Sequence, residues 1–158
     1  MARATVPSLP RMTIDGEYEP STLAWVRDQV ELYERTGGQE GATLRDSGLP
    51  VIIVTMRGNK SGKVRKIALM KVEHGGEYAL VASMGGAPTN PVWYYNLVSD
   101  PENVTVQDGP EPFAVRVREV DGDERQAWWD RSVAAFPNYA EYQARTERRI
   151  PVLIAAPR

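Results

Sequence analysis

The strongest chemical signal in the sequence is a run of positive charge between residues 57 and 71. The run contains no acidic residue, and its cationic side chains are Arg57, Lys60, Lys63, Arg65, Lys66 and Lys71. They surround a glycine-containing turn at residues 58–63, and free backbone N–H groups at such a turn can hold phosphate. The run therefore predicts a site for an anionic ligand, with a solvated, exposed hairpin as the alternative.

The same turn does not match the known nucleotide-binding loops. The spacing from Gly58 to Gly62 is one residue short of a phosphate-binding loop, and Val64 stands where that loop requires Ser or Thr. The sequence also contains no G-x-G-x-x-G fingerprint. Hydrolysis of nucleoside triphosphates and dinucleotide binding on a Rossmann fold therefore have no support.

A second candidate site lies at residues 82–97, where small residues precede an aromatic run. Residues 85–88 are Gly-Gly-Ala-Pro, which lets a ligand approach the backbone. Asn90 and Pro91 then predict the cap and first residue of a helix. A strand end beside a helix N-terminus suits a flat aromatic ligand with an anionic end, although a tight turn followed by a core helix fits equally well.

Aromatic spacing gives a third candidate, and the single histidine gives a weak fourth. Phe136, Tyr139 and Tyr142 are three residues apart, which predicts one face of a helix that forms either a ligand wall or part of the core. His74 sits in a turn beside two glycines, a position that suits a catalytic triad poorly.

Composition excludes several classes of chemistry. The chain has 158 residues, no Cys and one His, which excludes thiolate metal sites, iron–sulfur clusters, a Cys nucleophile and multi-His metal sites. The net charge of −2 argues against a general nucleic-acid binder. Residues 78–99 carry no charge, but their glycines, prolines and asparagines argue against a transmembrane segment. No signal peptide is recognisable, and we expect a cytoplasmic protein.

The elements that must position these candidates follow from periodicity and turn signals. We expect residues 1–19 to form an N-terminal arm and residues 20–158 to form a single domain. Four helical segments are predicted: one capped by Ser21 and ended by Gly37, one from Asn90 to Leu97, one at 121–135, and a piece carrying Tyr139 and Tyr142. Strands are predicted at 51–54, 65–72 and 78–83 as a β-meander, then at 104–107, 113–120 and 151–154. The result is an α+β fold of about six mainly antiparallel strands with flanking helices.

Taken together, residues 60–62, Arg65, 69–70, 78–83, 85–88 and 90–97 resemble the deazaflavin-dependent nitroreductase family of actinobacteria. The resemblance covers roughly residues 45–145 and is most specific at 81–97. It implies a split β-barrel of the FMN-binding type that binds coenzyme F420, an 8-hydroxy-5-deazaflavin. It also implies hydride transfer from the reduced cofactor to a small-molecule acceptor: a quinone, an unsaturated lactone such as an aflatoxin, or a nitroaromatic compound.

The resemblance assigns site residues by motif. The expected contacts to the cofactor's phosphate and oligoglutamate tail are Asn59, Lys60, Ser61, Arg65 and Lys66. The expected contacts to the ring are Ile67, Ala68, Leu69, Met70, Val81, Ala82, Ser83, Met84, Val92, Trp93, Tyr94, Tyr95 and Asn96. The expected substrate wall is Phe136, Tyr139 and Tyr142, and no metal is expected. A proton donor or orienting group is expected among Ser83, Tyr139, Tyr142 and water.

Two positions depart from the family pattern, and other functions remain open. Met84 stands where some relatives have Lys, and Phe136 stands where the nitroimidazole-activating member has Tyr, which argues against nitroimidazole as the substrate. The alternatives are an FMN-dependent split-barrel oxidoreductase, a non-catalytic deazaflavin carrier, and a nucleic-acid binder acting through residues 57–71. The sequence leaves two further questions open: the oligomeric state, and whether the protein associates peripherally with a membrane.

Overall fold

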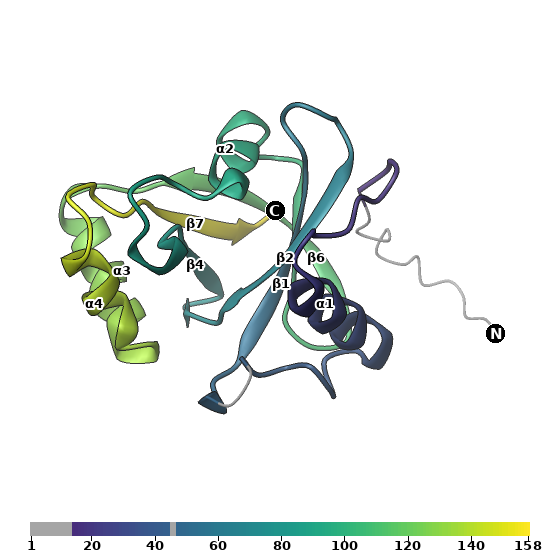
Figure 1. The fold of residues 1–158 in the computed structure, drawn as a ribbon, viewed down its shortest axis with the longest axis horizontal. Coiled ribbons are helices and arrows are strands. Elements are labelled where there is room, and N and C mark those ends of the chain that lie inside the picture. The colour runs from purple at the N-terminus through teal and green to yellow at the C-terminus, as the bar shows by residue number, and fades with distance from the viewer. Residues whose placement is uncertain (1–13, 45–46) are drawn as a thin grey trace.

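The computed structural model describes residues 14–44 and 47–158, so most of the expected N-terminal arm lies outside the described residues (Figure 1). Within them, seven strands form one antiparallel sheet in the order β2-β1-β5-β6-β7-β4-β3. The strands are β1 (Val51–Arg57), β2 (Val64–Met70), β3 (Glu73–His74), β4 (Glu77–Val81), β5 (Val104–Gln107), β6 (Pro112–Glu119) and β7 (Val152–Pro157). The α+β split-barrel prediction is confirmed, with β3 as a strand beyond the expected six.

The helices flank the curled sheet (Figure 1). They are α1 (Ala24–Thr36), α2 (Val92–Ser99), α3 (Gly122–Ala135) and α4 (Asn138–Ala144), with a short 3-10 turn, η2, at Met84–Gly86. Gly37 ends α1 in the left-handed conformation, as the sequence predicts. No helix in the described part of the chain is long and apolar enough to cross a membrane.

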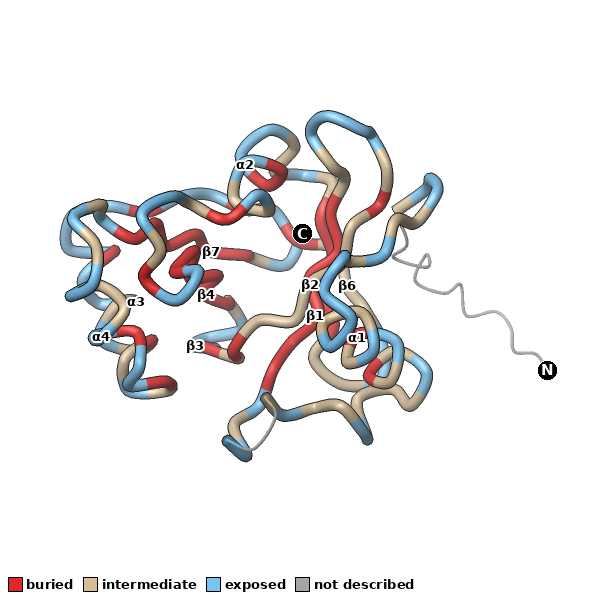
Figure 2. The backbone as a smooth tube through the Cα atoms, in the orientation of Figure 1, coloured by how far each residue is buried: buried red, intermediate tan, exposed pale blue. Residues whose placement is uncertain are grey.

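Strand β1 separates two apolar clusters because its side chains alternate between the faces of the sheet. Val51 and Ile53 face one cluster, to which α1, α3 and α4 contribute. Ile52 and Val54 face the other, which Leu97 of α2 helps to close. All six residues from 51 to 56 are buried, so β1 contributes side chains to the core on both of its faces (Figure 2).

The predicted β-meander is wrong at its third strand. Strand β2 pairs with β1, but β4 pairs with β7, with Leu80 opposite Leu153. The pairing to β7 matches apolar residues of β4 on both faces of the sheet. The Ala79 amide of β4 donates to the carbonyl of Val72, which lies between β2 and β3, at 2.9 Å, and this bond extends the β3–β4 pairing toward β2.

Two predicted helix caps are also wrong. Ser21 Oγ accepts a hydrogen bond from the Leu23 amide at 3.1 Å, and Leu23 itself is the residue before α1. Pro91 is the residue before α2, and the side chain of Asn90 is used elsewhere.

Phe136 ends α3 and therefore does not lie on the same helix as Tyr139. Pro137 causes that break, as the sequence suggests.

Candidate cofactor site

A groove between β2 and α2 consists of two adjoining cavities. The first measures about 320 Å³ and the second about 650 Å³. Both are lined by Arg65 of β2 and by Val92 and Asn96 of α2, so they are continuous at these residues. A ligand with two chemically different ends fits such a groove better than a compact one.

The smaller cavity forms the apolar end of the groove. Residues 67–69 of β2 form one side, and Trp93 of α2 forms another. Leu23 and Val26, at the start of α1, add further apolar surface, and Arg65 and Lys66 of β2 also line this cavity. Leu23 and Val92 are both exposed, at 56% and 72%, so apolar surface reaches the mouth of the groove. Such a lining suits a planar ring.

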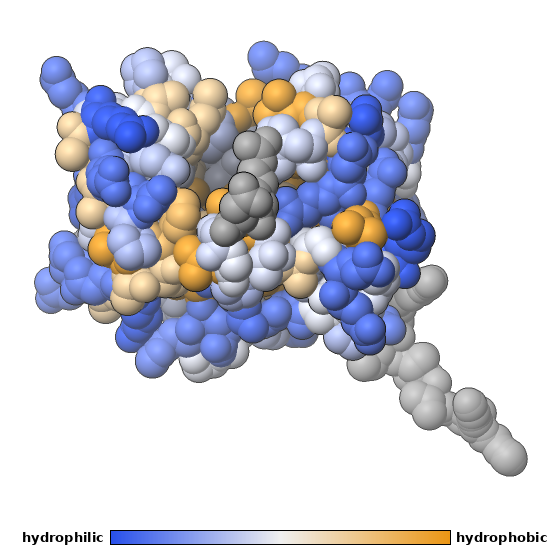
Figure 3. Space-filling view, turned by 60° about the horizontal axis from the view of Figure 1, so that its bottom comes forward, coloured by the Kyte–Doolittle hydropathy of each residue, from blue (hydrophilic) through white to orange (hydrophobic). Residues whose placement is uncertain are grey.

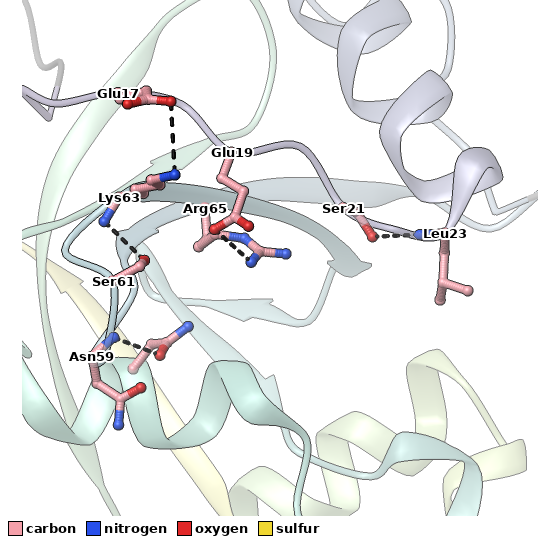
Figure 4. Close-up of polar contacts among 9 residues, drawn as sticks. Glu17, Glu19, Ser21, Leu23, Asn59, Ser61, Lys63 and Arg65 are labelled. Atoms are coloured by element: carbon pink, nitrogen blue, oxygen red, sulfur yellow. Dashed lines mark hydrogen bonds and ion pairs between the residues drawn. The ribbon is translucent and has the colours of Figure 1, made fainter.

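The larger cavity forms the cationic end of the groove. Lys60 and Arg65 line it together with the turn at residues 58–61 and with Tyr95 of α2. The buried Asn96 fixes this turn to α2, because its Oδ1 accepts a hydrogen bond from the Asn59 amide at 2.9 Å (Figure 4). The position of Lys60, which the turn carries, therefore depends on α2 as well.

The turn is tightly packed at its first position, Gly58. A Cβ on Gly58 would lie 2.8 Å from Ser61 Oγ, closer than real side chains approach. Ser61 Oγ accepts a hydrogen bond from the Lys63 amide at 3.1 Å, which holds the turn closed. The sequence predicts this turn correctly as a compact loop that presents cations.

Four of the six cations between residues 57 and 71 have carboxylate partners from other parts of the chain. Among the described residues, the pairs are Lys63–Glu17 at 3.8 Å, Arg65–Glu19 at 3.2 Å, Lys66–Glu34 at 2.6 Å and Lys71–Asp108 at 2.9 Å. Arg57 instead donates to the Gly62 carbonyl. No described carboxylate lies within ion-pair distance of Lys60. The sequence analysis missed these partners because they are distant along the chain.

The groove brings together most of the expected cofactor contacts. Those that line it are Asn59, Lys60, Ser61, Arg65, Lys66, Ile67, Ala68, Leu69, Val92, Trp93, Tyr95 and Asn96. The expected residues that line neither cavity are Met70, Val81, Ala82, Ser83, Met84, Tyr94, Phe136, Tyr139 and Tyr142. Leu23 and Val26 were not anticipated, although an apolar helix start just after Ser21 was a usable signal.

Tyr94 serves a different purpose from its neighbours on α2. Its hydroxyl donates to Glu119 Oε1 at 2.5 Å, which ties α2 to the end of β6. Burial, followed by this hydrogen bond to a carboxylate, raises the pKa of Tyr94 to about 12. Tyr94 is therefore a neutral hydrogen-bond donor at physiological pH.

Residues 82–90 are held by one arginine from the other end of the chain. Arg148, between α4 and β7, donates from Nε to the Ala87 carbonyl at 2.8 Å and from Nη2 to the Ser83 carbonyl at 2.7 Å. Its Nη1 donates to Asn90 Oδ1 at 2.7 Å and to the Ala82 carbonyl at 3.2 Å. This arginine therefore connects the end of β4 to the start of α2.

The three aromatic residues meet, although they do not share a helix. The ring centroids of Phe136 and Tyr139 are 5.0 Å apart, and those of Tyr139 and Tyr142 are 6.3 Å apart. The η2 turn packs against them so closely that a Cβ on Gly86 would lie 2.5 Å from the Tyr142 carbonyl oxygen. Tyr139 is 4% exposed, and burial raises its pKa. Its hydroxyl is therefore neutral at any physiological pH.

His74 lines neither cavity of the groove. His74 lies exposed on β3, edge-on to Trp128 at 6.1 Å between centroids. Among the described residues there is no cluster of His, Cys, Asp or Glu that could hold a metal ion. The groove combines a cationic end with an apolar wall, which fits a planar cofactor with an anionic tail.

Comparison with known proteins shows the family. Residues 25–157 match the model of the F420H(2)-dependent quinone reductase family, and the chain belongs to that family. It is therefore an F420-dependent reductase, with coenzyme F420 as its cofactor. The resemblance seen in the sequence is confirmed.

Curated relatives and solved structures agree with this membership. The chain is 32% identical over 126 residues to an F420H(2)-dependent quinone reductase of Mycobacterium tuberculosis, covering 78% of this chain and 83% of that protein. A putative F420H(2)-dependent quinone reductase of the same species is 36% identical over 110 residues, covering 70% and 92%.

Among solved structures, an F420-H2 dependent reductase, FDR-A, is 48% identical with a TM-score of 0.63, covering 67% of this chain and 93% of that one. A domain-swapped dimer is 45% identical with a TM-score of 0.65, covering 85% and 99%. At these levels of sequence identity, both solved structures support the split-barrel fold of this chain.

Proposed function

We propose that this chain binds F420 in the groove between β2 and α2 and transfers hydride from its reduced form to a quinone. The observation that carries the proposal is the groove itself, in which Lys60 lies at one end, Trp93 and residues 67–69 at the other, and Arg65 where the two cavities meet. The names of the relatives support a quinone as the acceptor.

Each end of the groove has a separate task in this proposal. The reduced deazaflavin, when bound, supplies the hydride. Lys60 and Arg65 hold its anionic tail by charge-assisted hydrogen bonds, and Asn96 keeps the turn that carries Lys60 in place. Trp93 and residues 67–69 orient the ring and exclude water from it. The protein therefore contributes binding and orientation rather than a nucleophile.

The acceptor side of the proposal rests on Ser83 and the aromatic cluster. We place the acceptor beside Phe136, Tyr139 and Tyr142, whose rings suit flat molecules. Ser83, Tyr139, Tyr142 or water supplies or orients the proton that reduction of a quinone also requires. Unsaturated lactones and nitroaromatics are further candidate acceptors, and Phe136 offers no hydroxyl to a nitroimidazole. A cytoplasmic location is part of the same proposal.

A paired titration tests the proposal. We expect the purified chain to bind F420 at least about tenfold more tightly than FMN, a difference of about 1.4 kcal/mol, measured by quenching of the cofactor's fluorescence. Steady-state oxidation of reduced F420 with a soluble quinone then separates an enzyme from a non-catalytic carrier. Tighter binding of FMN, or binding of F420 without turnover of any acceptor, would overturn the proposal.

A further inference from the structure

The segment that precedes α1 places carboxylates on the cations of β2. Residues 17–19 run beside the start of β2, where the Val64 amide donates to the Glu17 carbonyl at 2.8 Å and the Glu19 amide donates to the Val64 carbonyl at 2.9 Å. Backbone bonds on both sides of one residue fix the segment in register. The side chains of Glu17 and Glu19 therefore stand at defined positions.

The three consecutive side chains of this segment contact three cations. Glu17 pairs with Lys63 and Glu19 pairs with Arg65 (Figure 4). Lys66 Nζ lies 5.1 Å from the centre of the Tyr18 ring. Of the two glutamates, Glu19 alone lines the larger cavity, beside Lys60 and Arg65. Its carboxylate Oε1 is 3.2 Å from Arg65 Nη1.

Glu19 therefore stands in the part of the groove where an anionic ligand must bind. Its charge offsets one of the two cations that line the larger cavity. Any phosphate or carboxylate that reaches Arg65 has to share or replace this contact, and like charges at such short range repel. Lys60, which has no described carboxylate partner, is free of that competition.

We propose that Glu19 is a specificity-determining residue that competes with the anionic end of the ligand for Arg65. A ligand that carries several negative charges displaces the Glu19 carboxylate, because its contacts with Arg65 and Lys60 offset the loss of the Glu19–Arg65 ion pair. A ligand with one charge or none does not offset that loss. The identity of the ligand rests on the proposed function, but the competition between anions does not. An alternative role for Glu19, holding Arg65 in its binding orientation, predicts the opposite effect of its removal.

The variants that test this are Glu19→Gln and, as a matched control, Glu17→Gln. Both remove one carboxylate charge from the same segment, but Glu17 lies outside the cavity. Three probes are titrated against each protein at low salt and at about 0.5 M salt: inorganic tripolyphosphate, F420 with its phosphate and oligoglutamate tail, and the same deazaflavin ring with a ribityl chain and no phosphate.

We expect Glu19→Gln to bind tripolyphosphate and F420 about two- to fivefold more tightly than the wild-type protein at low salt, the range measured for exposed ion pairs. The gain shrinks at high salt because screening weakens all of these contacts. The phosphate-free deazaflavin, which has no anionic tail to reach Arg65, binds both proteins equally, and Glu17→Gln behaves as the wild type. Loss of folding cannot produce a gain in affinity.

The opposite outcomes overturn the inference. Weaker binding by Glu19→Gln shows that Glu19 orients Arg65, and equal or undetectable binding of tripolyphosphate by both proteins shows that no competition exists. Tripolyphosphate carries no ring, so a gain with this probe but no binding of F420 would refute the proposed function and leave the inference standing.

Discussion

At the scale of single residues, Lys60 and Arg65 carry the prediction that depends most directly on the groove. We expect Lys60→Ala and Arg65→Ala each to weaken F420 binding by about 1–3 kcal/mol, the usual cost of losing a charge-assisted contact. Arg116→Ala is the control, because Arg116 forms an exposed pair with Glu102 on the distant strand β6. If all three variants bind F420 alike, the turn is only a solvated hairpin and the anion site is elsewhere.

Tyr139 permits a second prediction at this scale. Burial keeps its hydroxyl protonated and its ring packs on Phe136 and Tyr142, which favours a packing role over proton delivery. We expect Tyr139→Phe to retain acceptor reduction within about twofold, and Tyr139→Ala to lower the free energy of unfolding by about 3–5 kcal/mol. Stopped-flow oxidation of reduced F420 and urea denaturation measure the two effects. A large loss of rate in Tyr139→Phe, with unchanged cofactor affinity, would instead identify the hydroxyl as part of the chemistry.

At the scale of elements, Arg148 fixes the connection from β4 to α2. The four hydrogen bonds of its guanidinium all reach acceptors at residues 82–90, where Met84 has a φ of 46° and the two following glycines are also left-handed. Because a Lys cannot reproduce the planar guanidinium, we expect Arg148→Lys to lower the free energy of unfolding by about 2–4 kcal/mol. Arg149→Lys, at the exposed neighbouring position, should change it by less than about 0.5 kcal/mol. Equal effects in urea denaturation would show that the segment holds its shape without Arg148.

The same segment shows what the sequence can predict about elements. Strands, turns and helix ends set by local pattern, such as β1 and the glycine after α1, were predictable because their causes lie within a few residues. The cap at Asn90 was not, because its side chain bonds Arg148, 58 positions away. Likewise, the gathering of cations around the turn at residues 58–63 was predictable, whereas the contribution of Glu19 was not, since nothing local couples residue 19 to β2.

At the scale of the whole molecule, the pairing of distant strands decides the architecture. Local pattern favoured a meander in which β4 follows β2 in space, but β4 pairs with β7 from the C-terminal end. The curl of the sheet still brings the end of β2 close to β4, and Figure 3 shows one resulting face, on which hydrophobic residues gather toward the middle and hydrophilic residues dominate the outer parts. The sequence indicated candidate segments for the site, but it did not show which of these segments line the same cavity.

One carboxylate joins the two ends of the curled sheet. Asp108, in the turn between β5 and β6, accepts a hydrogen bond from the Tyr78 hydroxyl at 2.6 Å and pairs with Lys71 at 2.9 Å. Lys71 directly follows β2, and Tyr78 lies on β4. Because the side chain of Asp108 is only 20% exposed and Tyr78 is buried, losing Asp108 would leave the Tyr78 hydroxyl without this acceptor and the half-buried Lys71 without its carboxylate.

We expect Asp108→Ala to lower the free energy of unfolding by about 2–4 kcal/mol and Tyr78→Phe by about 1 kcal/mol. The double variant should fall short of their sum by at least about 0.5 kcal/mol, because both changes remove the same hydrogen bond. Urea denaturation of the four proteins provides the cycle. Strict additivity would mean that Asp108 stabilises the fold through Lys71 alone.

The pH dependence of the same contact gives an independent check. Burial, followed by the hydrogen bond to Asp108, raises the pKa of Tyr78 above its ordinary value near 10. The native state therefore favours the protonated phenol, so this contribution is fully present below about pH 10 and is lost as the pH rises above it. Wild-type stability should fall more steeply in alkali than that of Tyr78→Phe, since the variant has no hydroxyl to ionise at this position. If the two curves stay parallel from neutral pH into alkali, the contact between Tyr78 and Asp108 does not contribute to holding the two ends of the sheet together.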